Sequence, residues 1–244
     1  MRNKIDLSPN YSKKTRNLRD IKFVIIHYTG MQSEIESINR LKDPRKKVSS
    51  HYLINRKGRI TKMVIERNTA WHAGKSRWKN YLNLNRYSIG IELVNKGHEF
   101  GYQKYSSIQI KNLINLCKNL KKKYKIKNEN FLGHSDIAPL RKVDPGEKFP
   151  WQKLSKYNLG IWYKKNPQNF KIQKDKKKYK FFSNIYKIGY RYFSLNQRIA
   201  QKDKKIIKAF QQKFLPSRVS GKIDQKTLEI SYYLASRYKI LKKT

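Results

Sequence analysis

Three side chains that bind metal ions or carry charge lie close together in residues 133–146, GHSDIAPLRKVDPG: His134, Lys142 and Asp144. Imidazole and carboxylate both bind zinc, but a catalytic zinc site normally needs three protein ligands and keeps a fourth position for water. The third candidate is His27, at the end of the apolar run KFVIIH. Two nitrogens and one oxygen from these residues would bind Zn²⁺, which predicts a zinc hydrolase.

A carboxylate and an ammonium could complete the chemistry. Glu92 interrupts the apolar run SIGIELV, where a buried carboxylate is costly unless it is paired or binds a metal ion. It could accept a proton from water and later protonate a leaving nitrogen. Lys142 could stabilise the oxyanion of a tetrahedral intermediate. The alternatives are a core glutamate satisfied by neighbours and one more solvent-exposed lysine.

The elements that must position these residues alternate between strands and helices. The predicted strands are 23–26, 51–55, 59–65, 87–94 and a short one near 131. The predicted helices are 33–41 and a longer helix that begins at Ser106 or Ser107 and ends near 123. Side chains alternate along a strand, so His27 shares a face with Ile25, and Glu92 shares one with Gly90. This order predicts an α/β fold with a mixed central sheet flanked by helices.

The chain divides into three parts by composition. Residues 1–163 form the predicted catalytic domain, and the Lys-rich segment 164–180 is predicted as a linker. Residues 181–244 contain three stretches with helical periodicity, which predict a small three-helix module.

The chain has 244 residues and a formal net charge of +42. Such a charge favours binding to polyanions such as nucleic acid, acidic lipid or anionic wall polymers, although a Lys- and Asn-rich composition is also typical of an AT-rich genome. The single cysteine, Cys117, excludes an internal disulfide. The N-terminus lacks the apolar segment of a secretory signal, and no apolar stretch is long enough to span a membrane. We therefore expect a cytoplasmic protein, with the periplasm as the alternative, and a monomer.

Several motifs occur in a characteristic order within residues 21–155: FVIIHYT, VSSHYLINRKG, AWHAG, SIGIELVN and GHSDIAPLRKVDPG. In these the chain resembles the zinc-dependent N-acetylmuramoyl-L-alanine amidases, which are related to a phage-type lysozyme and to the peptidoglycan recognition proteins. It is most similar to the Gram-negative branch that contains the anhydromuropeptide-recycling amidase and its lipoprotein relative. The resemblance implies one zinc ion per chain and these roles: His27, His134 and Asp144 as ligands, Glu92 as acid and base, and Lys142 as oxyanion partner.

The resemblance also implies a substrate and a reaction. The family cleaves the amide bond between the lactyl group of N-acetylmuramic acid and L-alanine, in peptidoglycan or in muropeptides, during wall turnover or recycling. His51 and His72 lie in family motifs, so we expect them either to contact substrate or to support loops. Two positions depart from the pattern: Ser50 stands where the phage branch has a tyrosine, and Glu147 stands where a proline is usual.

The tail is similar to the three-helix peptidoglycan-binding module of some of these amidases. The similarity lies in the segment AFQ, the turn GKID and the helix start after Asp224. We expect deletion of residues 175–244 to weaken sedimentation with insoluble sacculi and to spare hydrolysis of small muropeptides.

Two other functional classes are alternatives to the amidase. A non-catalytic peptidoglycan receptor of the same fold should have lost a zinc ligand, and all three candidates are present. The charge of +42 favours a nucleic-acid-binding protein, but the lysines form no single cluster and the tail shows no recognition-helix pattern. We therefore expect no specific nucleic-acid partner.

Overall fold

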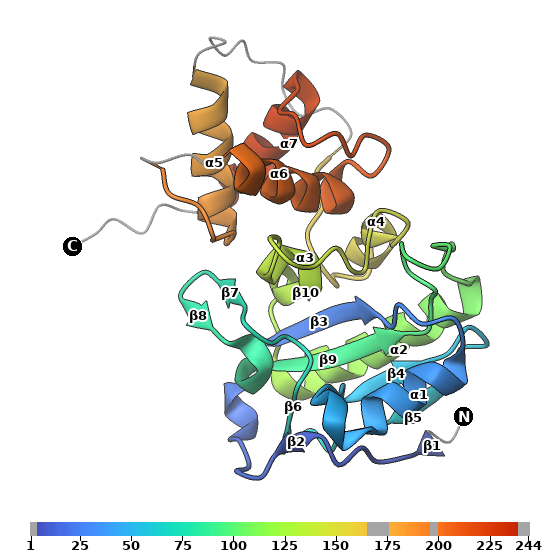
Figure 1. Ribbon diagram of the computed structural model, residues 1–244. Helices are drawn as coiled ribbons and strands as arrows, with labels where there is room; N and C mark the ends of the chain where they lie inside the picture. Colours follow the sequence, from blue (N-terminus) through green and yellow to red (C-terminus); the bar gives the residue numbers. More distant parts are fainter. Residues whose placement is uncertain (1–3, 165–175, 196–199, 239–244) are drawn as a thin grey trace.

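The computed structural model describes residues 4–164, 176–195 and 200–238 of the chain. Its central feature is a six-stranded mixed sheet with helices on both faces, and three further helices lie together beyond one edge of that sheet (Figure 1). The predicted α/β class is confirmed.

The sheet has the strand order β1-β5-β4-β9-β3-β10. The described residues form the strands β1 (Lys4–Ile5), β2 (Tyr11–Ser12), β3 (Phe23–Tyr28), β4 (Tyr52–Ile54), β5 (Ile60–Lys62), β6 (Thr69–Ala70), β7 (Arg77–Trp78), β8 (Tyr81–Leu82), β9 (Ser88–Leu93) and β10 (Phe131–Gly133). Strands β4, β9, β3 and β10 run parallel to one another, and β5 pairs antiparallel with β4 through the predicted hairpin. The short pairs β2–β6 and β7–β8 lie outside the main sheet and were not predicted.

The α-helices are α1 (Glu34–Lys42), α2 (Ser107–Tyr124), α3 (His134–Ile137), α4 (Trp151–Ser155), α5 (Lys177–Ile188), α6 (Ala200–Phe214) and α7 (Gln225–Ser236). Ser33 and Ser106 begin α1 and α2, and their side chains accept hydrogen bonds from backbone N–H groups three residues later. Asp224 caps α7 in the same way through the Thr227 N–H.

The alternation predicted for β3 and β9 separates two parts of the core. Val24 and Ile26 of β3, with Ile89 and Ile91 of β9, pack against the apolar face of α2. Phe23 and Ile25 face the opposite side and belong to a second cluster. Since β3 and β9 pair in parallel register, His27 lies directly beside Glu92 at the carboxyl ends of both strands. The sheet thus places the two predicted site residues side by side.

The described structure differs from the predicted division of the tail. Helix α5 begins at Lys177, inside the segment predicted as a linker, and residues 165–175 of that segment lie outside the described residues. Side chains of the C-terminal helices share one buried cluster with Trp78 of β7 and Ile137 of α3. The tail therefore packs against the domain that contains the sheet, and its bounds as a module stay a prediction.

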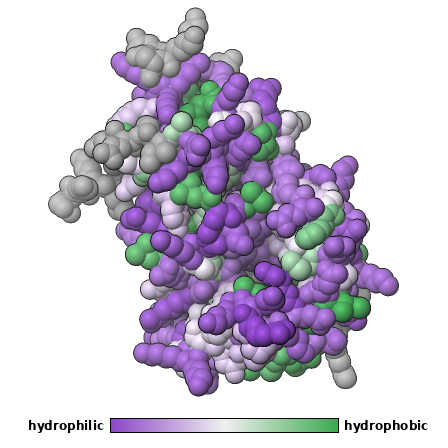
Figure 2. Space-filling view, viewed as in Figure 1, coloured by the Kyte–Doolittle hydropathy of each residue, from purple (hydrophilic) through white to green (hydrophobic). Residues whose placement is uncertain are grey.

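The viewed face of the molecule is mostly hydrophilic, with separate hydrophobic patches (Figure 2). In the described part of the chain, no helix combines the length and the apolar character that crossing a membrane requires.

Candidate active site

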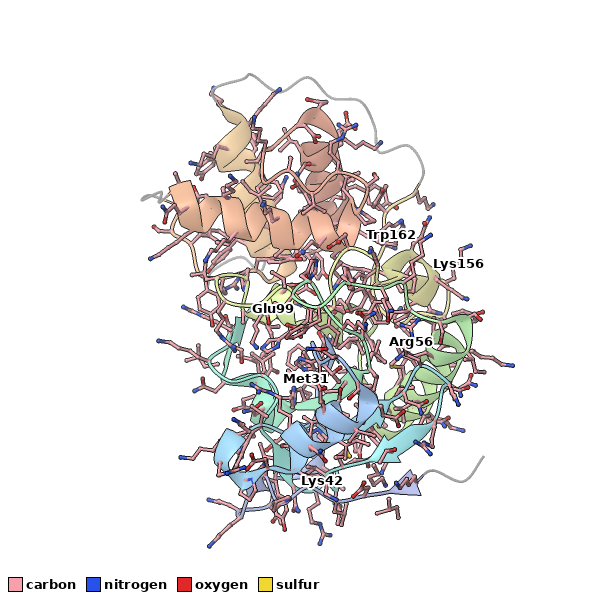
Figure 3. The ribbon with its side chains drawn as sticks, turned by 45° about the vertical axis from the view of Figure 1, so that its right-hand side comes forward. Met31, Lys42, Arg56, Glu99, Lys156 and Trp162 are labelled. Carbon is pink, nitrogen blue, oxygen red and sulfur yellow. The ribbon has the colours of Figure 1, made fainter. Side chains whose placement is uncertain are left out.

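A cavity of about 350 Å³ opens at the carboxyl ends of β3 and β9. Met31 and Glu99 belong to its lining and are labelled between α1 and the C-terminal helices in Figure 3. Six of the seven predicted site residues line this cavity: His27, His72, Glu92, His134, Lys142 and Asp144. The structure therefore brings together residues that are up to 117 positions apart in the sequence.

Three of these residues converge on one point. The Nδ1 atoms of His27 and His134 lie 3.0 Å apart, and Asp144 Oδ2 lies 3.0 Å from the first and 3.2 Å from the second. A tetrahedral ion with ligand distances of about 2.0–2.1 Å would separate its donor atoms by about 3.3 Å. The donor types and their spacing therefore fit a zinc-like divalent cation bound by His27, His134 and Asp144.

Electrostatics favour the ligand forms of these groups. Burial and the neighbouring His134 lower the pKa of His27 to about 4, so this imidazole is neutral at neutral pH. Burial alone would raise the pKa of Asp144, but the two neighbouring imidazoles, His134 more than His27, hold that pKa well below its usual range. A neutral imidazole and an ionised carboxylate are the forms that bind a metal ion.

A chain of hydrogen bonds fixes which nitrogen of His27 faces the cation. The carbonyl oxygen of Leu84 accepts the hydroxyl proton of Ser88 at 2.6 Å, so Ser88 Oγ must accept from His72 Nε2–H at 3.2 Å. His72 Nδ1 is then unprotonated and accepts from His27 Nε2–H at 3.0 Å. This leaves the lone pair of His27 Nδ1 directed at the other two ligands. His72 is thus a positioning residue for His27.

Strand β9 makes room for this arrangement. Ser88, Gly90 and Glu92 share one face of β9 and all lie beside the histidines. A Cβ at Gly90 would lie 2.4 Å from the Cγ atom of the His72 ring, so a side chain there would displace His72. Sequence reasoning identified this face but did not assign roles to Ser88 and Gly90.

The second imidazole ligand is oriented by a backbone carbonyl. His134 Nε2 lies 3.1 Å from the carbonyl oxygen of Ala73, which can only accept. His134 Nε2 therefore carries the proton, and Nδ1 presents its lone pair to the metal position. The motif AWHAG thus orients both imidazole ligands, one through His72 and the other through Ala73.

Glu92 lies in the same cavity with one oxygen that has no partner. Its Oε2 is buried and makes no hydrogen bond to any residue that the structure describes. Burial, and then the carboxylate of Asp144, raise the pKa of Glu92 to about 8. An unpaired carboxylate with a raised pKa in a cavity is suited to proton transfer.

Cationic side chains surround the opening. Lys142 is exposed at the cavity rim, as its predicted role requires, and Arg40 and Arg141 also line the cavity. Arg141 donates hydrogen bonds to the carbonyl oxygens of Ala73 and Lys75, which ties the segment of Lys142 to the AWHAG motif. Sequence reasoning did not single out Arg40 or Arg141, although Arg141 lies in the motif that carries Lys142.

His51 is not part of the cavity lining. Its side chain is fully buried, and its Nδ1 accepts a hydrogen bond of 3.0 Å from the Gly90 N–H. The Arg16 guanidinium lies 2.7 Å from its Nε2 atom. Sequence reasoning left substrate contact and loop support open for His51, and in this position the side chain contacts the backbone of β9.

Comparison with known proteins places the site in a family. Residues 17–147 match the family model described as N-acetylmuramoyl-L-alanine amidase. The N-acetylmuramoyl-L-alanine amidase AmiD of Escherichia coli is 36% identical over 233 residues, which cover 89% of this chain and 83% of that protein. The 1,6-anhydro-N-acetylmuramyl-L-alanine amidase AmpD of Haemophilus influenzae is 34% identical over 164 residues, which cover 60% of this chain and 86% of that protein.

Solved structures agree with this assignment. AmiD from E. coli, solved with the substrate anhydro-N-acetylmuramic acid-L-Ala-D-γ-Glu-L-Lys, has a TM-score of 0.79 and 31% identity, with coverage of 94% of this chain and 93% of that one. AmpDH3 from Pseudomonas aeruginosa has a TM-score of 0.80 and 30% identity, with coverage of 94% and 97%. The likeness to both structures extends over nearly the whole of this chain.

Proposed function

This chain belongs to the N-acetylmuramoyl-L-alanine amidase family, and from that premise we propose that it hydrolyses the amide bond between the lactyl group of N-acetylmuramic acid and L-alanine. The substrate is peptidoglycan or a muropeptide released from it, and the reaction serves wall turnover or recycling. The observation that carries the proposal is the convergence of His27, His134 and Asp144 beside an unpaired Glu92 in one cavity.

The three converging ligands bind one zinc ion per chain. A catalytic zinc site has three protein ligands and a fourth position for water. Here two imidazole nitrogens and one carboxylate oxygen are the protein ligands, and the fourth position opens to the cavity. When bound, zinc polarises the scissile carbonyl and acidifies water. His72 and Ala73 hold the two imidazoles in the tautomers that leave Nδ1 free.

Glu92 transfers the protons of the reaction. Glu92 lines the cavity beside the ligands, so its carboxylate can accept a proton from the attacking water. A carboxyl group with a raised pKa also returns that proton readily, here to the nitrogen of L-alanine as the amide bond breaks. A zinc ion held by the three ligands would favour the ionised form of Glu92.

Lys142 and the two arginines complement negative charge on the substrate. Lys142 lies at the rim beside Asp144, where its ammonium can stabilise the oxyanion that develops on the carbonyl. Arg40 and Arg141 suit the carboxylates of a stem peptide.

We also propose that the protein acts as a monomer, which light scattering after size-exclusion chromatography tests. Action in the cytoplasm, with the periplasm as the alternative, is likewise a proposal, which cell fractionation tests.

Mass spectrometry of reaction products tests the activity. Purified muropeptides and whole sacculi are incubated with the zinc-loaded protein, and chelator-treated protein is the control. We expect products that gain one water at the lactyl–alanine bond, giving a free peptide that begins with L-alanine. Intact substrate, or cleavage at a different bond, would refute the proposal.

A further inference from the structure

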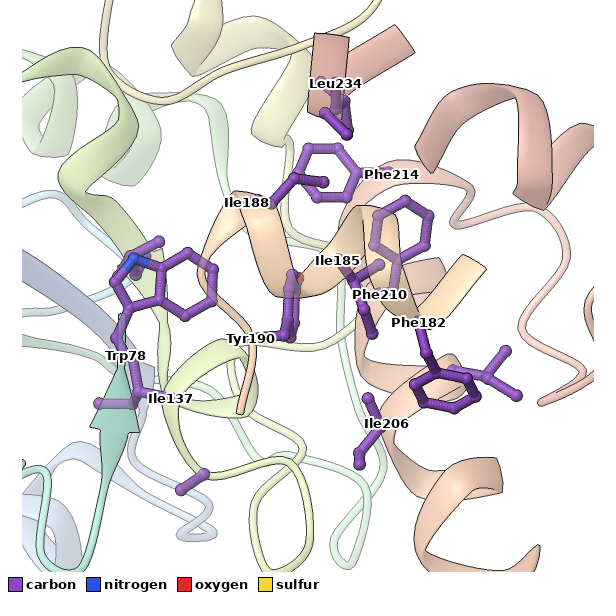
Figure 4. Close-up of a cluster of buried hydrophobic side chains, with 14 of the residues drawn as sticks. Trp78, Ile137, Phe182, Ile185, Ile188, Tyr190, Ile206, Phe210, Phe214 and Leu234 are labelled. Atoms are coloured by element: carbon purple, nitrogen blue, oxygen red, sulfur yellow. The ribbon is translucent and has the colours of Figure 1, made fainter. Parts of the chain in front are cut away.

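The three C-terminal helices pack directly on the part of the sheet domain that carries the metal ligands. We call the described residues of 176–238, which include α5, α6 and α7, the C-terminal helical unit and residues 4–164 the sheet domain. In the shared cluster, Trp78 and Ile137 meet Tyr190, Phe210 and other apolar side chains of the unit (Figure 4). The ring centroids of Trp78 and Tyr190 lie 4.9 Å apart, and a Cβ at Gly189 would lie 2.4 Å from the Trp78 ring. The two parts are therefore closely fitted.

A buried ion pair lies within this interface. Lys213 Nζ of α6 lies 2.6 Å from Asp136 Oδ2 of α3, and their side chains are only 4% and 1% exposed. The lysine also lies 4.1 Å from the Trp151 ring centroid and 3.3 Å from the carbonyl oxygen of Phe131. Tyr190 donates its hydroxyl proton to Asp136 Oδ1 at 2.5 Å. Both members of the ion pair thus have several partners.

Asp136 stabilises the backbone at the junction of β10 and α3, directly before the metal ligand His134. Its Oδ2 accepts a hydrogen bond of 2.8 Å from the Gly133 N–H, at the junction of β10 and α3. His134 follows at once, and the Ser135 N–H donates to the carbonyl oxygen of Asp144 at 2.9 Å. One carboxylate therefore fixes the helical turn that holds His134 and contacts the backbone of Asp144.

Helix α6 contacts the same segment at two further points. Lys205 Nζ donates to the carbonyl oxygen of Leu140 at 3.1 Å, and Gln212 Nε2 lies 3.5 Å from Glu147 Oε2. Together with Lys213, these contacts lie on both sides of Lys142 and Asp144 in the sequence. Glu147, which replaces the usual proline, takes part in this contact.

The ion pair between Lys213 and Asp136 is better explained by the orientation that it gives to α3 than by a contribution to folding stability. Desolvation of two buried charges largely offsets their attraction, so an apolar pair of similar volume is often equally stable. Helix α3 has only four residues, and so short a helix does not form without external contacts. The fixed orientation of α3 must therefore come from its neighbours, and α6 supplies a directional one.

We infer that Lys213 and Tyr190 are positioning residues for the metal site: through Asp136 they hold the segment 133–144 so that the donor atoms of His134 and Asp144 are preset. The inference rests on the proposed zinc site. It makes the C-terminal helical unit part of the catalytic machinery rather than only a wall-binding appendage.

The test compares Lys213→Met with Lys208→Met in the full chain. Lys208 is exposed on the same helix, so its replacement removes a charge without touching Asp136. We expect Lys213→Met to lower zinc affinity by about tenfold or more, the usual effect of losing a residue that orients a metal ligand, and Lys208→Met to leave it unchanged. Affinity is measured by competition with a chromophoric chelator. Tyr190→Phe should act in the same direction with a smaller effect.

Hydrogen exchange of the metal-free protein gives a second readout. Peptides covering residues 133–144 should exchange faster in Lys213→Met than in the wild type or Lys208→Met, while peptides of α2 stay protected. If Lys213→Met does not fold, the double variant Asp136→Asn/Lys213→Met removes both charges and leaves neither one unpaired. This double variant should also show weak zinc binding and fast exchange.

The outcomes separate the inference from the proposed function. Wild-type zinc affinity and wild-type exchange of residues 133–144 in folded Lys213→Met, or in the double variant, would overturn the inference. Absence of amidase activity in the wild type, together with weakened zinc binding in Lys213→Met, would instead refute the proposed reaction and leave the inference standing. Absence of zinc binding in the wild type would refute the metal site, on which the inference rests.

Discussion

At the scale of single residues, the site depends on groups that orient the ligands as much as on the ligands themselves. His72 and Ala73 are adjacent in the sequence, and each fixes the tautomer of a different imidazole. Ser88 extends this control by accepting a hydrogen bond from His72. Loss of such outer partners typically weakens metal binding without removing it. The ligand set and its supporting residues can therefore be distinguished by mutation.

The first prediction concerns Glu92→Gln. This change keeps the size of the side chain but removes its ability to accept a proton, so zinc should still bind while kcat falls by about 10²–10⁴-fold. Plasma emission measures the bound zinc, and muropeptide hydrolysis measures turnover. A variant that retains wild-type turnover would exclude Glu92 as the base.

The second prediction concerns the hydrogen-bond chain behind His27. His72→Phe removes the acceptor of His27 Nε2–H, and we expect zinc affinity to fall by about 10–100-fold. Ser88→Ala should lower it less, because His72 remains in place. Competition with a chelator measures both affinities.

Ser155→Ala is the matched control for Ser88→Ala. Ser155 also donates to a backbone carbonyl, but it is half-buried on α4 and does not line the cavity. If His72→Phe binds zinc as tightly as the wild type, the assignment of the His27 tautomer is wrong.

At the scale of secondary-structure elements, the strands and the faces of their side chains could be predicted from the sequence. The distant side chains that contact those faces could not. The apolar runs of β3 and β9 define their alternation locally, so the positions of His27 and Glu92 followed from period alone. The orienting role of His72 depends on a contact across 45 positions. Local patterns carry no information about such contacts.

The C-terminal helices illustrate the same limit. The period of α6 predicts a helix, but Lys213 appears in the sequence as one of many lysines. Its burial against Asp136 and Trp151 depends on how two parts of the chain dock. For this reason the sequence predicted a linker and a small module, but not the core that the module shares with the sheet domain.

The third prediction concerns the contact between β4, α2 and the loop after β5. Tyr52, Lys123 and Tyr124 all donate hydrogen bonds to the carboxylate of Glu66. Burial opposes ionisation of Glu66, but these three hydrogen bonds outweigh it and lower its pKa to about 2. We expect Glu66→Gln to lower the free energy of unfolding at neutral pH, by at most about 3 kcal/mol.

The pH dependence of this effect has a defined sign. In the unfolded chain Glu66 has its ordinary pKa of 4.5, so protons bind the unfolded state first as the pH falls. The stabilisation is complete above that value and is lost as the pH falls toward the native pKa of about 2. Urea unfolding of wild type and Glu66→Gln across this range measures it, and a difference that does not shrink toward acid pH would contradict the role of the Glu66 charge.

At the scale of the whole molecule, two features remain to be connected with function: the net charge of +42 and the docked C-terminal helical unit. A charge of this size attracts anionic polymers, and the match to AmiD over 89% of the chain includes much of the tail. Binding to the wall by this unit stays a prediction, separate from its contact with the metal site.

The fourth prediction concerns this charge. If it contributes to wall binding, co-sedimentation with insoluble sacculi should decrease strongly as salt shortens the Debye length from about 10 Å at 0.1 M to about 3 Å at 1 M. Hydrolysis of small muropeptides should change much less. If sedimentation does not decrease with salt, the net charge reflects the amino-acid composition and does not contribute to wall binding.

The central claim is that His27, His134 and Asp144 together bind one zinc ion. Anomalous X-ray diffraction at the zinc edge, on crystals of the zinc-replete protein, tests it most directly. We predict one peak per chain within about 2.0–2.2 Å of His27 Nδ1, His134 Nδ1 and a carboxylate oxygen of Asp144. A peak bound to other residues, or no peak at these three side chains, would contradict the account.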